Sequence, residues 1–307
     1  MSRFVHSNTC KELLNGSKIV LLDGGARGSL FSPFDQVDPS LLIVVKVEPD
    51  ASAPVTKSEQ EVVFNKAIWK NEETIAIHIA NEPSVSSVYP PNIDLAKRFI
   101  DIIGEPARTT KQVVQVEASS IDTLFAQEGL PFPDFIKLDI HGCEYEALSG
   151  ALKSLESKTI ALVIESWVIE AHKGQQLLFK TDELLHEHGF YPHETSIGAW
   201  DYKSTEQLYS KPQAVISESL YFKDIVHTNQ SMDVVQGVKL IAIAELYGHV
   251  GFALLLTDYL LEKQVISQVI HAQITSEIKT NNQQSAWARF SKRVRNKLIR
   301  MLSDTNN

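Results

Sequence analysis

The sequence has little cysteine, no long apolar run and no surplus of positive charge. Its 307 residues include two cysteines, Cys10 and Cys143, which can form neither a disulfide framework nor a Cys-x-x-Cys metal site. No stretch approaches the roughly 18 uncharged apolar residues that a membrane-spanning helix needs. The first residues also lack the apolar run of a signal peptide. These absences predict a cytoplasmic protein with reduced thiols.

The formal net charge of −9 argues against a protein that coats nucleic acid. Phosphate binding needs clustered positive charge, so no nucleic-acid partner is predicted. Hydrophobic residues make up 43% of the chain and charged residues 22%, which is close to the average of globular proteins. Length and composition are therefore sufficient for a sizeable core in one or two domains.

Strands and helices are expected to alternate over residues 1–225. Runs such as LLIVVKV and TIALVIE are almost entirely apolar, which is typical of strands covered on both faces of a parallel sheet. Strands are expected at Ile19–Leu22, Leu42–Val47, Val62–Asn65, Ile75–Ile79, Val113–Val116, Phe135–Ile140, Thr159–Glu165 and Leu220–Phe222. Helices are expected at Leu95–Ile103, Ile121–Glu128, Glu144–Leu155 and Leu177–His188. This alternation predicts a doubly wound α/β domain with a mostly parallel sheet.

A helical C-terminal extension is expected over residues 226–307. Residues Val238–Val265 are dense in Leu, Ile and Ala, which predicts one or two buried helices. Residues 285–302 carry basic side chains around an apolar stripe at helical spacing. This tail has two interpretations, and both stay open. It is an interfacial helix that places the protein on the inner membrane surface or on a protein partner, or its stripe packs on the domain or on a second copy in a homo-oligomer.

The first chemical signal is the segment KIVLLDGGARG, in which a buried strand ends at Asp23 and glycines follow at once. Glycine allows positive φ and lets backbone N–H groups approach a ligand closely. The next strand ends at Glu48, about 20 residues further on, where a carboxylate can accept hydrogen bonds from both ribose hydroxyls. The combination predicts a nucleoside-containing cofactor. The cofactor-binding residues expected in the loop are Asp23, Gly24, Gly25, Ala26 and Gly28.

The residue at the strand end also favours one cofactor over another. Dinucleotide sites usually carry Gly-x-Gly-x-x-Gly, with glycine where this chain has Asp23 and Ala26. A carboxylate at the strand end repels a pyrophosphate but suits the positively charged methionine moiety of S-adenosylmethionine. The loop therefore favours S-adenosylmethionine and methyl transfer.

The second chemical signal is DFIKLDIHGCEYEALSGA, a strand followed by a tight turn and a helix. Lys137 and Asp139 point to the same face because strand side chains alternate. Asp139 ends a central strand at the edge where ligands bind, which makes it the first candidate for a general base. His141 is the second candidate, since the pKa of histidine suits a base near neutrality. Glu165 ends the next strand, in VIES, and is expected to face the same cleft.

These landmarks resemble the FkbM-type methyltransferase family. LLDGGARG is similar to the glycine loop of the family, and VEPD, with Glu48 and Pro49, is similar to its strand-two acid. The segment Asn65–Trp69, which contains Ala67, resembles an Asn-x-Ala section of the family. The most specific match is SIDTLF followed by Lys-x-Asp-x-x-Gly-x-Glu-x-x-x-Leu-x-Gly. The resemblance covers roughly residues 18–223.

The resemblance implies a Rossmann-like class I methyltransferase that uses S-adenosylmethionine to O-methylate a hydroxyl of a sugar, a glycan or a related small molecule. It also implies that Pro49, Ala67 and Asp139 contact the cofactor. Transfer would be an in-line displacement, in which positioning supplies much of the rate and a base takes the hydroxyl proton.

Two alternatives stay open. A nicotinamide-dependent oxidoreductase needs a Tyr-x-x-x-Lys pair or a separate substrate domain with conspicuous His or Arg. Tyr259 and Lys263 have the spacing of the pair, but they lie in the terminal helical region with no catalytic Ser nearby. The other alternative is a Rossmann-like module that binds a partner without catalysis. The histidines form no His-Glu-x-x-His motif, so the sequence predicts no metal site.

Overall fold

The computed structural model describes residues 3–52, 61–100, 103–203 and 210–282. The chain forms two compact units. One contains Lys18–Asp35 and Pro39–Asp224 and holds the β-sheets. The other joins residues 3–17 and Gln36–Asp38 to residues 225–282. The sequence analysis placed residues 1–17 in the α/β domain, whereas in the structure they group with the C-terminal helices.

The secondary structure of the α/β unit alternates along the chain. Its strands are β1 (Ile19–Gly24), β2 (Leu42–Val47), β3 (Glu61–Phe64), β4 (Ala67–Ile68), β5 (Glu73–Ala80), β6 (Thr110–Ser119), β7 (Phe135–Leu138), β8 (Ala161–Trp167), β9 (Phe190–Trp200) and β10 (Gln213–Lys223). Its helices are α2 (Ile93–Ala96), α3 (Glu105–Arg108), α4 (Ile121–Gln127), α5 (Glu144–Ser149), α6 (Leu152–Ser157) and α7 (Leu178–Glu187), with short 3₁₀ turns η3 (Pro39–Leu41) and η4 (Pro83–Val85).

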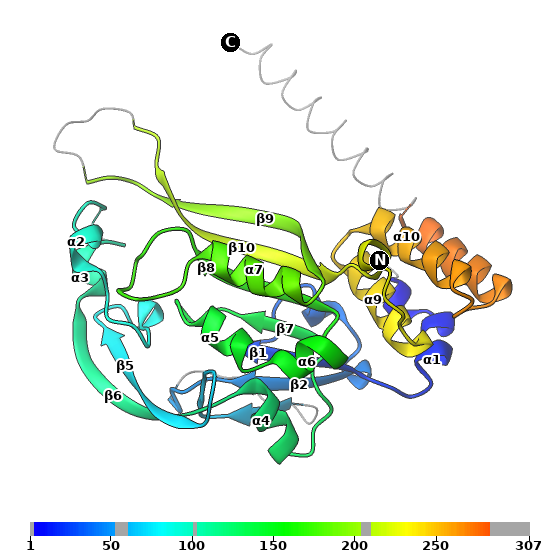
Figure 1. The fold of residues 1–307 in the computed structure, drawn as a ribbon, viewed down its shortest axis with the longest axis horizontal. Helices are drawn as coiled ribbons and strands as arrows, with labels where there is room; N and C mark the ends of the chain where they lie inside the picture. Colours follow the sequence, from blue (N-terminus) through cyan, green and yellow to red (C-terminus); the bar gives the residue numbers. More distant parts are fainter. Residues whose placement is uncertain (1–2, 53–60, 101–102, 204–209, 283–307) are drawn as a thin grey trace, which may run out of the picture. The chain divides into compact units, whose positions relative to one another are not determined.

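Seven strands form the central sheet in the order β3-β2-β1-β7-β8-β10-β9 (Figure 1). The pairs from β3 to β8 are parallel, and β10 is antiparallel to both β8 and β9. Within the central sheet the chain runs first through β1, then outward through β2 to β3, and it returns to β7 on the other side of β1. This reversal confirms the predicted doubly wound, mostly parallel α/β fold.

The main core lies between the central strands and the helices that cover them. Apolar side chains of β1, β7 and β8 pack against α4, α5 and α7, and the cluster includes Leu22, Ile136, Leu162, Phe125, Leu148 and Leu185, all buried. The continuous apolar runs of the sequence supply these strands, as expected for a sheet whose strands are covered. This core fixes the strand ends that carry the polar residues described below.

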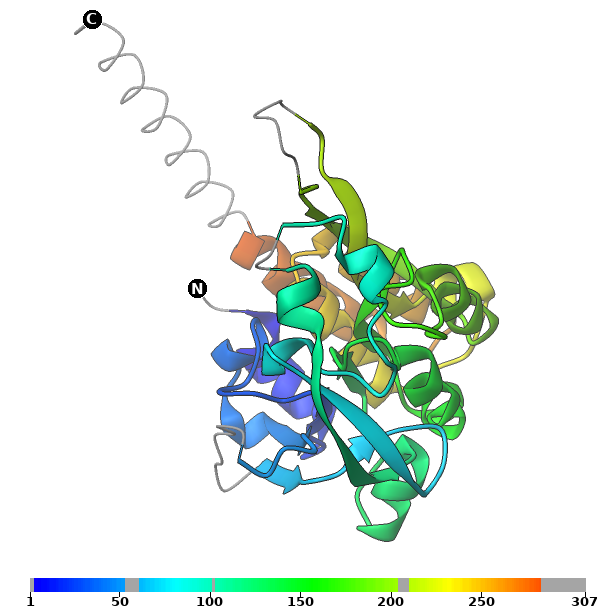
Figure 2. The ribbon, with the colours of Figure 1, turned by 90° about the vertical axis from the view of Figure 1, so that its left-hand side faces the viewer.

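A second, smaller sheet has the order β4-β6-β5 and stands apart from the central sheet at one end of the unit (Figures 1 and 2). Its strands β5 and β6 are antiparallel and β4 is parallel to β6. Trp69, Ile75 and Ile77 form a buried cluster on it, with Cys143 from the turn after β7. The sequence analysis expected β5 and β6 but not their separate sheet.

Two predicted helices were wrong in their extent. The helix expected at Leu95–Ile103 is a single turn, α2, because the backbone N–H of Ile100 donates to the carbonyl of Asp201 in a distant segment (3.2 Å). The helix expected at Glu144–Leu155 is divided into α5 and α6. At the division Gly150 passes so close to the carbonyl of Trp69 that a Cβ would overlap it, and the carboxylate of Asp122 caps the first turn of α6.

Other local predictions were confirmed and two strands were missed. The Ser120 hydroxyl accepts from the backbone N–H of Thr123 at the start of α4 (3.1 Å), and Gly189 has a left-handed φ of 81° after α7. The missed strands are β4, which is two residues long, and β9, whose side chains are mostly exposed. Neither carries the apolar pattern that sequence analysis can detect.

The helical unit contains η1 (Phe4–His6), α1 (Asn8–Leu14), α8 (Ile225–Thr228), α9 (Val234–Leu246), α10 (Val250–Glu262) and a helix at 268–282. The two helices α9 and α10 confirm the prediction made for this stretch. The carboxylate of Glu245 on α9 is buried, accepts from the backbone N–H of Phe4 (3.3 Å) and pairs with Arg3 (3.6 Å), which ties the chain start to this unit.

Within the described residues, every helix is too short or too polar to span a bilayer. The basic tail predicted at 285–302 lies outside the described residues. The two cysteines, Cys10 and Cys143, are free and buried.

Candidate active site

The carboxyl ends of β1, β2 and β7 meet where the strand order reverses. In the sheet register Gly24 lies beside Val47 and beside Leu138, so the residues that follow these three come to one edge. Those residues are Gly25, Glu48 and Asp139. Open α/β sheets bind ligands in the crevice at this point. A cavity of about 700 Å³ opens here, which is within the size range of small-molecule sites.

Glu48 forms one end of the cavity and is 4% exposed. One carboxylate oxygen, Oε1, accepts from the backbone N–H of Asp50 (2.9 Å). The other, Oε2, lies 3.5 Å from Nε of Arg27, which comes from the glycine loop. The Arg27 side chain is partly exposed and can move without breaking the core. Glu48 is thus a fixed carboxylate with one exchangeable partner.

Gly25 brings the glycine loop into contact with the end of β7. Its φ is +79°, and a Cβ at this position would overlap the carbonyl oxygen of Asp139. Its backbone N–H donates to the carbonyl of Val47 (2.9 Å), so the loop is also tied to β2. Only glycine fits both the left-handed conformation and the close approach.

A row of alternating charges runs across the strand ends below the cavity. Lys137 lies beside Asp23 in the register, and its Nζ is 3.7 Å from Oδ1 of Asp23 and 3.5 Å from Oδ2 of Asp139. Burial raises the pKa of Asp23, against the lowering effects of Lys137 and of Lys46. Oδ1 of Asp23 is buried and has no hydrogen-bond partner among the described residues. The row therefore leaves a buried acceptor at the cavity floor.

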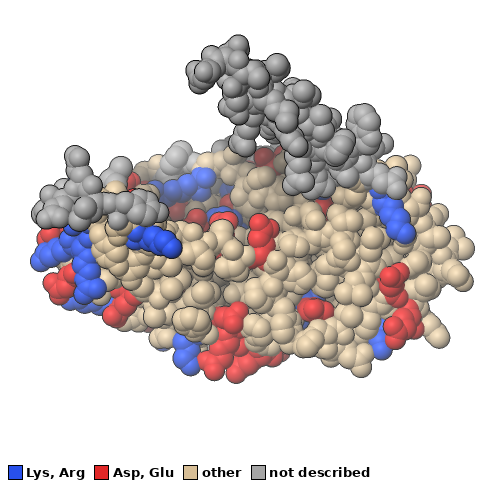
Figure 3. Space-filling view, turned by 90° about the horizontal axis from the view of Figure 1, so that it is seen from above, with Lys and Arg blue, Asp and Glu red and all other residues tan. Residues whose placement is uncertain are grey.

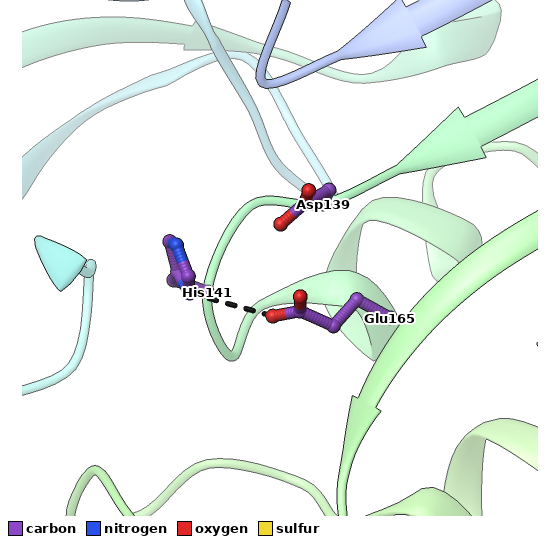
Figure 4. A group of neighbouring side chains, drawn as sticks. All are labelled: Asp139, His141 and Glu165. Atoms are coloured by element: carbon purple, nitrogen blue, oxygen red, sulfur yellow. Dashed lines mark ion pairs between the residues drawn. The ribbon is translucent and has the colours of Figure 1, made fainter. Parts of the chain in front are cut away.

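Asp139, His141 and Glu165 form a cluster at the other end (Figure 4). One ligand atom from each lies within 4.8 Å of the other two. Asp139 and Glu165 are neighbours because Leu138 pairs with Ile164 across the parallel strands β7 and β8. Nδ1 of His141 is 3.4 Å from Oε1 of Glu165. The structure thus brings together the three side chains that the sequence analysis named as catalytic candidates.

The turn that carries His141 is held in an unusual backbone conformation. His141 has a φ of +55° and Gly142 a φ of +106°. The buried carboxylate of Glu144 accepts from the backbone N–H groups of Ile140 (3.1 Å) and Gly142 (2.9 Å). Ser87 donates to the carbonyl of His141 (2.6 Å). Left-handed residues other than glycine cost energy and persist where the surroundings fix them, as they do here.

The ionisable groups in and beside the cluster shift one another's pKa values. Burial raises the pKa of Glu144 to about 8, and the charge of Glu165 acts in the same direction. Burial also raises the pKa of Glu165, although His141 opposes the effect. Burial by itself would lower the pKa of His141, but its contact with Glu165 and the charge of that carboxylate outweigh burial and raise the pKa. The contact between the two side chains therefore raises the pKa of the His141 imidazole and opposes the rise of the pKa at the Glu165 carboxyl.

Aromatic rings and a buried arginine surround the cluster. The ring centre of Trp167 lies 6.3 Å from that of His141 and 5.4 Å from that of His172. The guanidinium of Arg108 lies 4.3 Å from the ring centre of Trp200 and 5.1 Å from that of Trp167. Burial lowers the pKa of Arg108 to about 10 and that of His172 to about 3, the latter with help from the charge of Arg108.

The sequence analysis did not predict this surrounding shell. Arg108, His172 and Trp200 come from separate segments, and no motif joins them. Arg27 was also missed, although it stands inside the glycine loop that drew attention to Asp23. Its place between glycines at a predicted ligand edge was a usable signal.

The predicted cofactor residues divide into two groups. Those on the cavity wall are Asp23, Gly25, Glu48, Pro49, Ala67 and Asp139. Gly24, Ala26 and Gly28 are not part of the wall. Gly24 instead packs where a Cβ would overlap the side chains of Ile68 and Leu138. Among the catalytic candidates, Asp139 and His141 line the cavity. Glu165 was expected to face the same cleft, but it is not on the cavity wall and pairs with His141 instead, because strand register places it beside the turn after β7.

The small sheet supplies an apolar wall opposite the polar edge. Ile77 and Ile79 from β5 and Val114 and Val116 from β6 line the cavity. The cavity is therefore polar along the strand ends and apolar on the side of the small sheet. This division suits a ligand that presents polar groups to one side and an apolar surface to the other.

Tyr259 and Lys263, the pair that an oxidoreductase would need, belong to the helical unit. The Tyr259 hydroxyl donates to the carbonyl of Gln230 (3.1 Å), and the Lys263 ammonium lies over the Tyr259 ring, 5.2 Å from its centre. Neither residue lines the cavity. Their contacts are those of a structural pair at the end of α10.

The family of this chain is identified by one family model. A family model described as the methyltransferase FkbM domain matches residues 24–192, more than half of the chain. A crystal structure of methyltransferase FkbM from Methylobacillus flagellatus KT is 16% identical, with a TM-score of 0.34, and the match covers 67% of this chain. The chain spans only 44% of the length of that protein. No curated protein sequence matches the chain.

Proposed function

Because the chain belongs to the FkbM methyltransferase family, we propose that it transfers a methyl group from S-adenosylmethionine to a hydroxyl oxygen of a sugar, a glycan or a related small molecule. One observation carries the proposal. A single cavity has the Glu48 carboxylate at one end and Asp139 and His141 at the other, with Gly25 between them. A carboxylate suited to ribose and two candidates for the general base therefore line one cavity.

The residues present fit S-adenosylmethionine. Glu48 is fixed at the end of β2, where a carboxylate can accept from both ribose hydroxyls once Arg27 moves aside. Asp23 offers a buried oxygen without a hydrogen-bond partner at the cavity floor. This oxygen could accept a hydrogen bond from the methionine ammonium. Ala67 and Ile68 line the wall beside Pro49 and provide apolar contact for a base. A phosphate placed beside Asp23 would meet a carboxylate instead of a donor.

The bound cofactor supplies an electrophilic methyl group and leaves as S-adenosylhomocysteine. Asp139 takes the proton of the acceptor hydroxyl at the cavity wall, and His141, held by Glu165, orients that hydroxyl by a hydrogen bond. The acceptor oxygen, having given its proton to Asp139, would take the methyl group that the cofactor supplies. Glu48 and Asp139 follow strands that both pair with β1, and this register fixes the relative position of the two residues, as transfer that depends on positioning requires.

The face seen in Figure 3 carries charges of both signs. On the face seen in Figure 3, Lys and Arg side chains are interspersed with Asp and Glu among uncharged residues, and those of the described part form no continuous basic area. Phosphate-rich partners need such an area. The apolar wall of Ile77, Ile79, Val114 and Val116 favours an acceptor that carries its hydroxyl on a partly apolar scaffold.

The test is calorimetric titration of the full chain with S-adenosylmethionine, S-adenosylhomocysteine and NAD. Micromolar binding of the first two, without NAD binding, is the expected result. Binding of NAD alone would favour the oxidoreductase alternative. Absence of binding to all three ligands would overturn the proposal and favour a module that binds a partner without catalysis. Acceptors are then screened by transfer of labelled methyl groups.

A further inference from the structure

The cluster of Asp139, His141 and Glu165 has the composition of a metal site. It offers two carboxylates and an imidazole, with one ligand atom from each within 4.8 Å of the others. Figure 4 shows the three side chains around a shared space beside the loop that follows β7. First-row divalent cations such as Mn²⁺ accept both oxygen and imidazole ligands. We propose that these three residues bind one divalent cation, a site that the sequence motifs did not indicate.

Two of the ligand atoms lack a hydrogen-bond partner. Nδ1 of His141 and Oε1 of Glu165 are closed off from solvent and lie 3.4 Å apart, yet neither makes a hydrogen bond with a described residue. Buried polar atoms without a partner are rare, because each costs free energy. A cation bound by both atoms would satisfy them together. This observation is independent of the composition of the cluster.

The charges around the cluster favour a cation. The carboxylates of Asp139 and Glu165 lie on either side of the His141 imidazole within the cluster. The Lys137 ammonium forms an ion pair with Asp139 of the cluster and a second ion pair with Asp23. Carboxylates gathered in a partly buried site attract a divalent ion far more strongly than they would in water. The site is thus electrostatically prepared for a positive ligand.

The backbone holds the ligands in place before any ion binds. Asp139 and Glu165 come from adjacent strands whose register is fixed by the pairing of Leu138 with Ile164. His141 is fixed by its own turn, where Ser87 holds its carbonyl (2.6 Å) and Glu144 holds the next N–H. Sites with ligands on such rigid elements bind metal without a large ordering cost.

The cation would have a free coordination position on the cavity side. Asp139 and His141 line the cavity, so an acceptor oxygen can reach the ion there. This role, unlike the binding itself, rests on the proposed function. A hydroxyl bound to a divalent cation loses its proton more readily, so that Asp139 can take the proton through the carboxylate oxygen that is not bound to the ion.

The test is titration of the EDTA-treated full chain with Mn²⁺ alone, followed by electron paramagnetic resonance of the free ion. We expect one equivalent to bind, with affinity falling at least about tenfold in Glu165→Gln and in His141→Ala. Glu218→Gln is the matched control, since Glu218 lies opposite Glu165 on β10 but is exposed and outside the cluster. The control should bind Mn²⁺ like the wild type.

S-adenosylhomocysteine binding, measured in parallel, separates the two proposals. The wild type and Glu165→Gln, whose side chain is not on the cavity wall, should bind it equally with and without EDTA, which also shows that this variant is folded. Failure of the wild type to bind Mn²⁺ up to millimolar concentration would overturn the metal site and leave the methyltransferase proposal standing. Mn²⁺ binding that survives both cluster variants would also overturn it. Competition by Mg²⁺ and Zn²⁺ then ranks the ions.

Discussion

The two ends of the cavity differ in whether their polar side-chain atoms have partners. At the Glu48 end both carboxylate oxygens have partners, the backbone N–H of Asp50 and the side chain of Arg27. At the other end His141 and Glu165 face each other without a hydrogen bond. The first end is built from the glycine loop and from the strand that ends at Glu48, both of which are recognisable in the sequence. The second depends on the register of β7 with β8 and on a left-handed residue, and it is left open for a ligand.

Gly25 is the link between the two ends, and its substitution should have the largest effect. In Gly25→Ala the new Cβ would overlap the carbonyl of Asp139 and sit at a φ of +79°. We expect a loss of about 4 kcal/mol in the free energy of unfolding, from left-handed strain together with overpacking. Gly28→Ala is the matched control, since Gly28 has the same φ but open space around it. It should cost about 1 kcal/mol. Denaturant unfolding measures both, and equal losses would contradict the close contact.

Glu48→Gln should break the cofactor end and leave the cluster end unchanged. Removing the charge weakens the hydrogen bonds to the ribose, so the Kd for S-adenosylhomocysteine should rise roughly 10- to 100-fold in calorimetry. Mn²⁺ binding should stay at the wild-type value. Asp50→Asn is the control, because Asp50 lines the same wall. Its carboxylate already accepts from the backbone N–H of Ser52 (2.9 Å). If the control weakened binding as much as Glu48→Gln, the assignment of the ribose contact would be wrong.

Lys137→Met should destabilise the floor that both ends share. The ammonium pairs with Asp23 and Asp139, and its loss leaves two partly buried carboxylates unpaired. We expect a loss of roughly 2 kcal/mol in the free energy of unfolding. Lys153→Met, on the exposed side of α6, should cost less than about 0.5 kcal/mol. In a double-mutant cycle Asp23→Asn should recover part of the loss; strictly additive effects would show that the pairing contributes nothing.

His172 should leave stability at neutral pH unchanged and affect it only at acidic pH. Burial lowers its pKa from 6.5 to about 3, so the unfolded chain binds a proton in this interval that the folded chain refuses. Stability is therefore complete above pH 6.5 and falls toward pH 3, by up to about 1.4 kcal/mol per pH unit from this group. His172→Gln should flatten the decline in unfolding free energy between pH 6 and 4. His186→Gln, at a half-exposed histidine of α7, should leave the slope unchanged. Parallel curves for wild type and His172→Gln would contradict the buried neutral state.

Much of the fold could be predicted because its strands are apolar runs with polar ends. The runs ending at Asp23 and Glu48 gave both the sheet and the cofactor edge, and Ser120 and Gly189 marked helix boundaries through local backbone chemistry. β9 was missed because an exposed strand carries no apolar pattern. The long helix expected at 144–155 is broken at Gly150, because the chain there packs against the carbonyl of Trp69. Such contacts join distant segments and leave no local periodicity.

The sequence by itself determined the α/β fold, the strand-end carboxylates and the candidates Asp139, His141 and Glu165, since strand ends and glycine turns are encoded within a few residues. Tertiary structure alone decided that His141 faces Glu165, that Arg108 and His172 surround them, and that residues 1–17 join the C-terminal helices. The physical reason is that side-chain proximity follows strand register and packing across tens of residues. A register shift of one residue would turn Glu165 to the other face of the sheet while leaving the sequence unchanged.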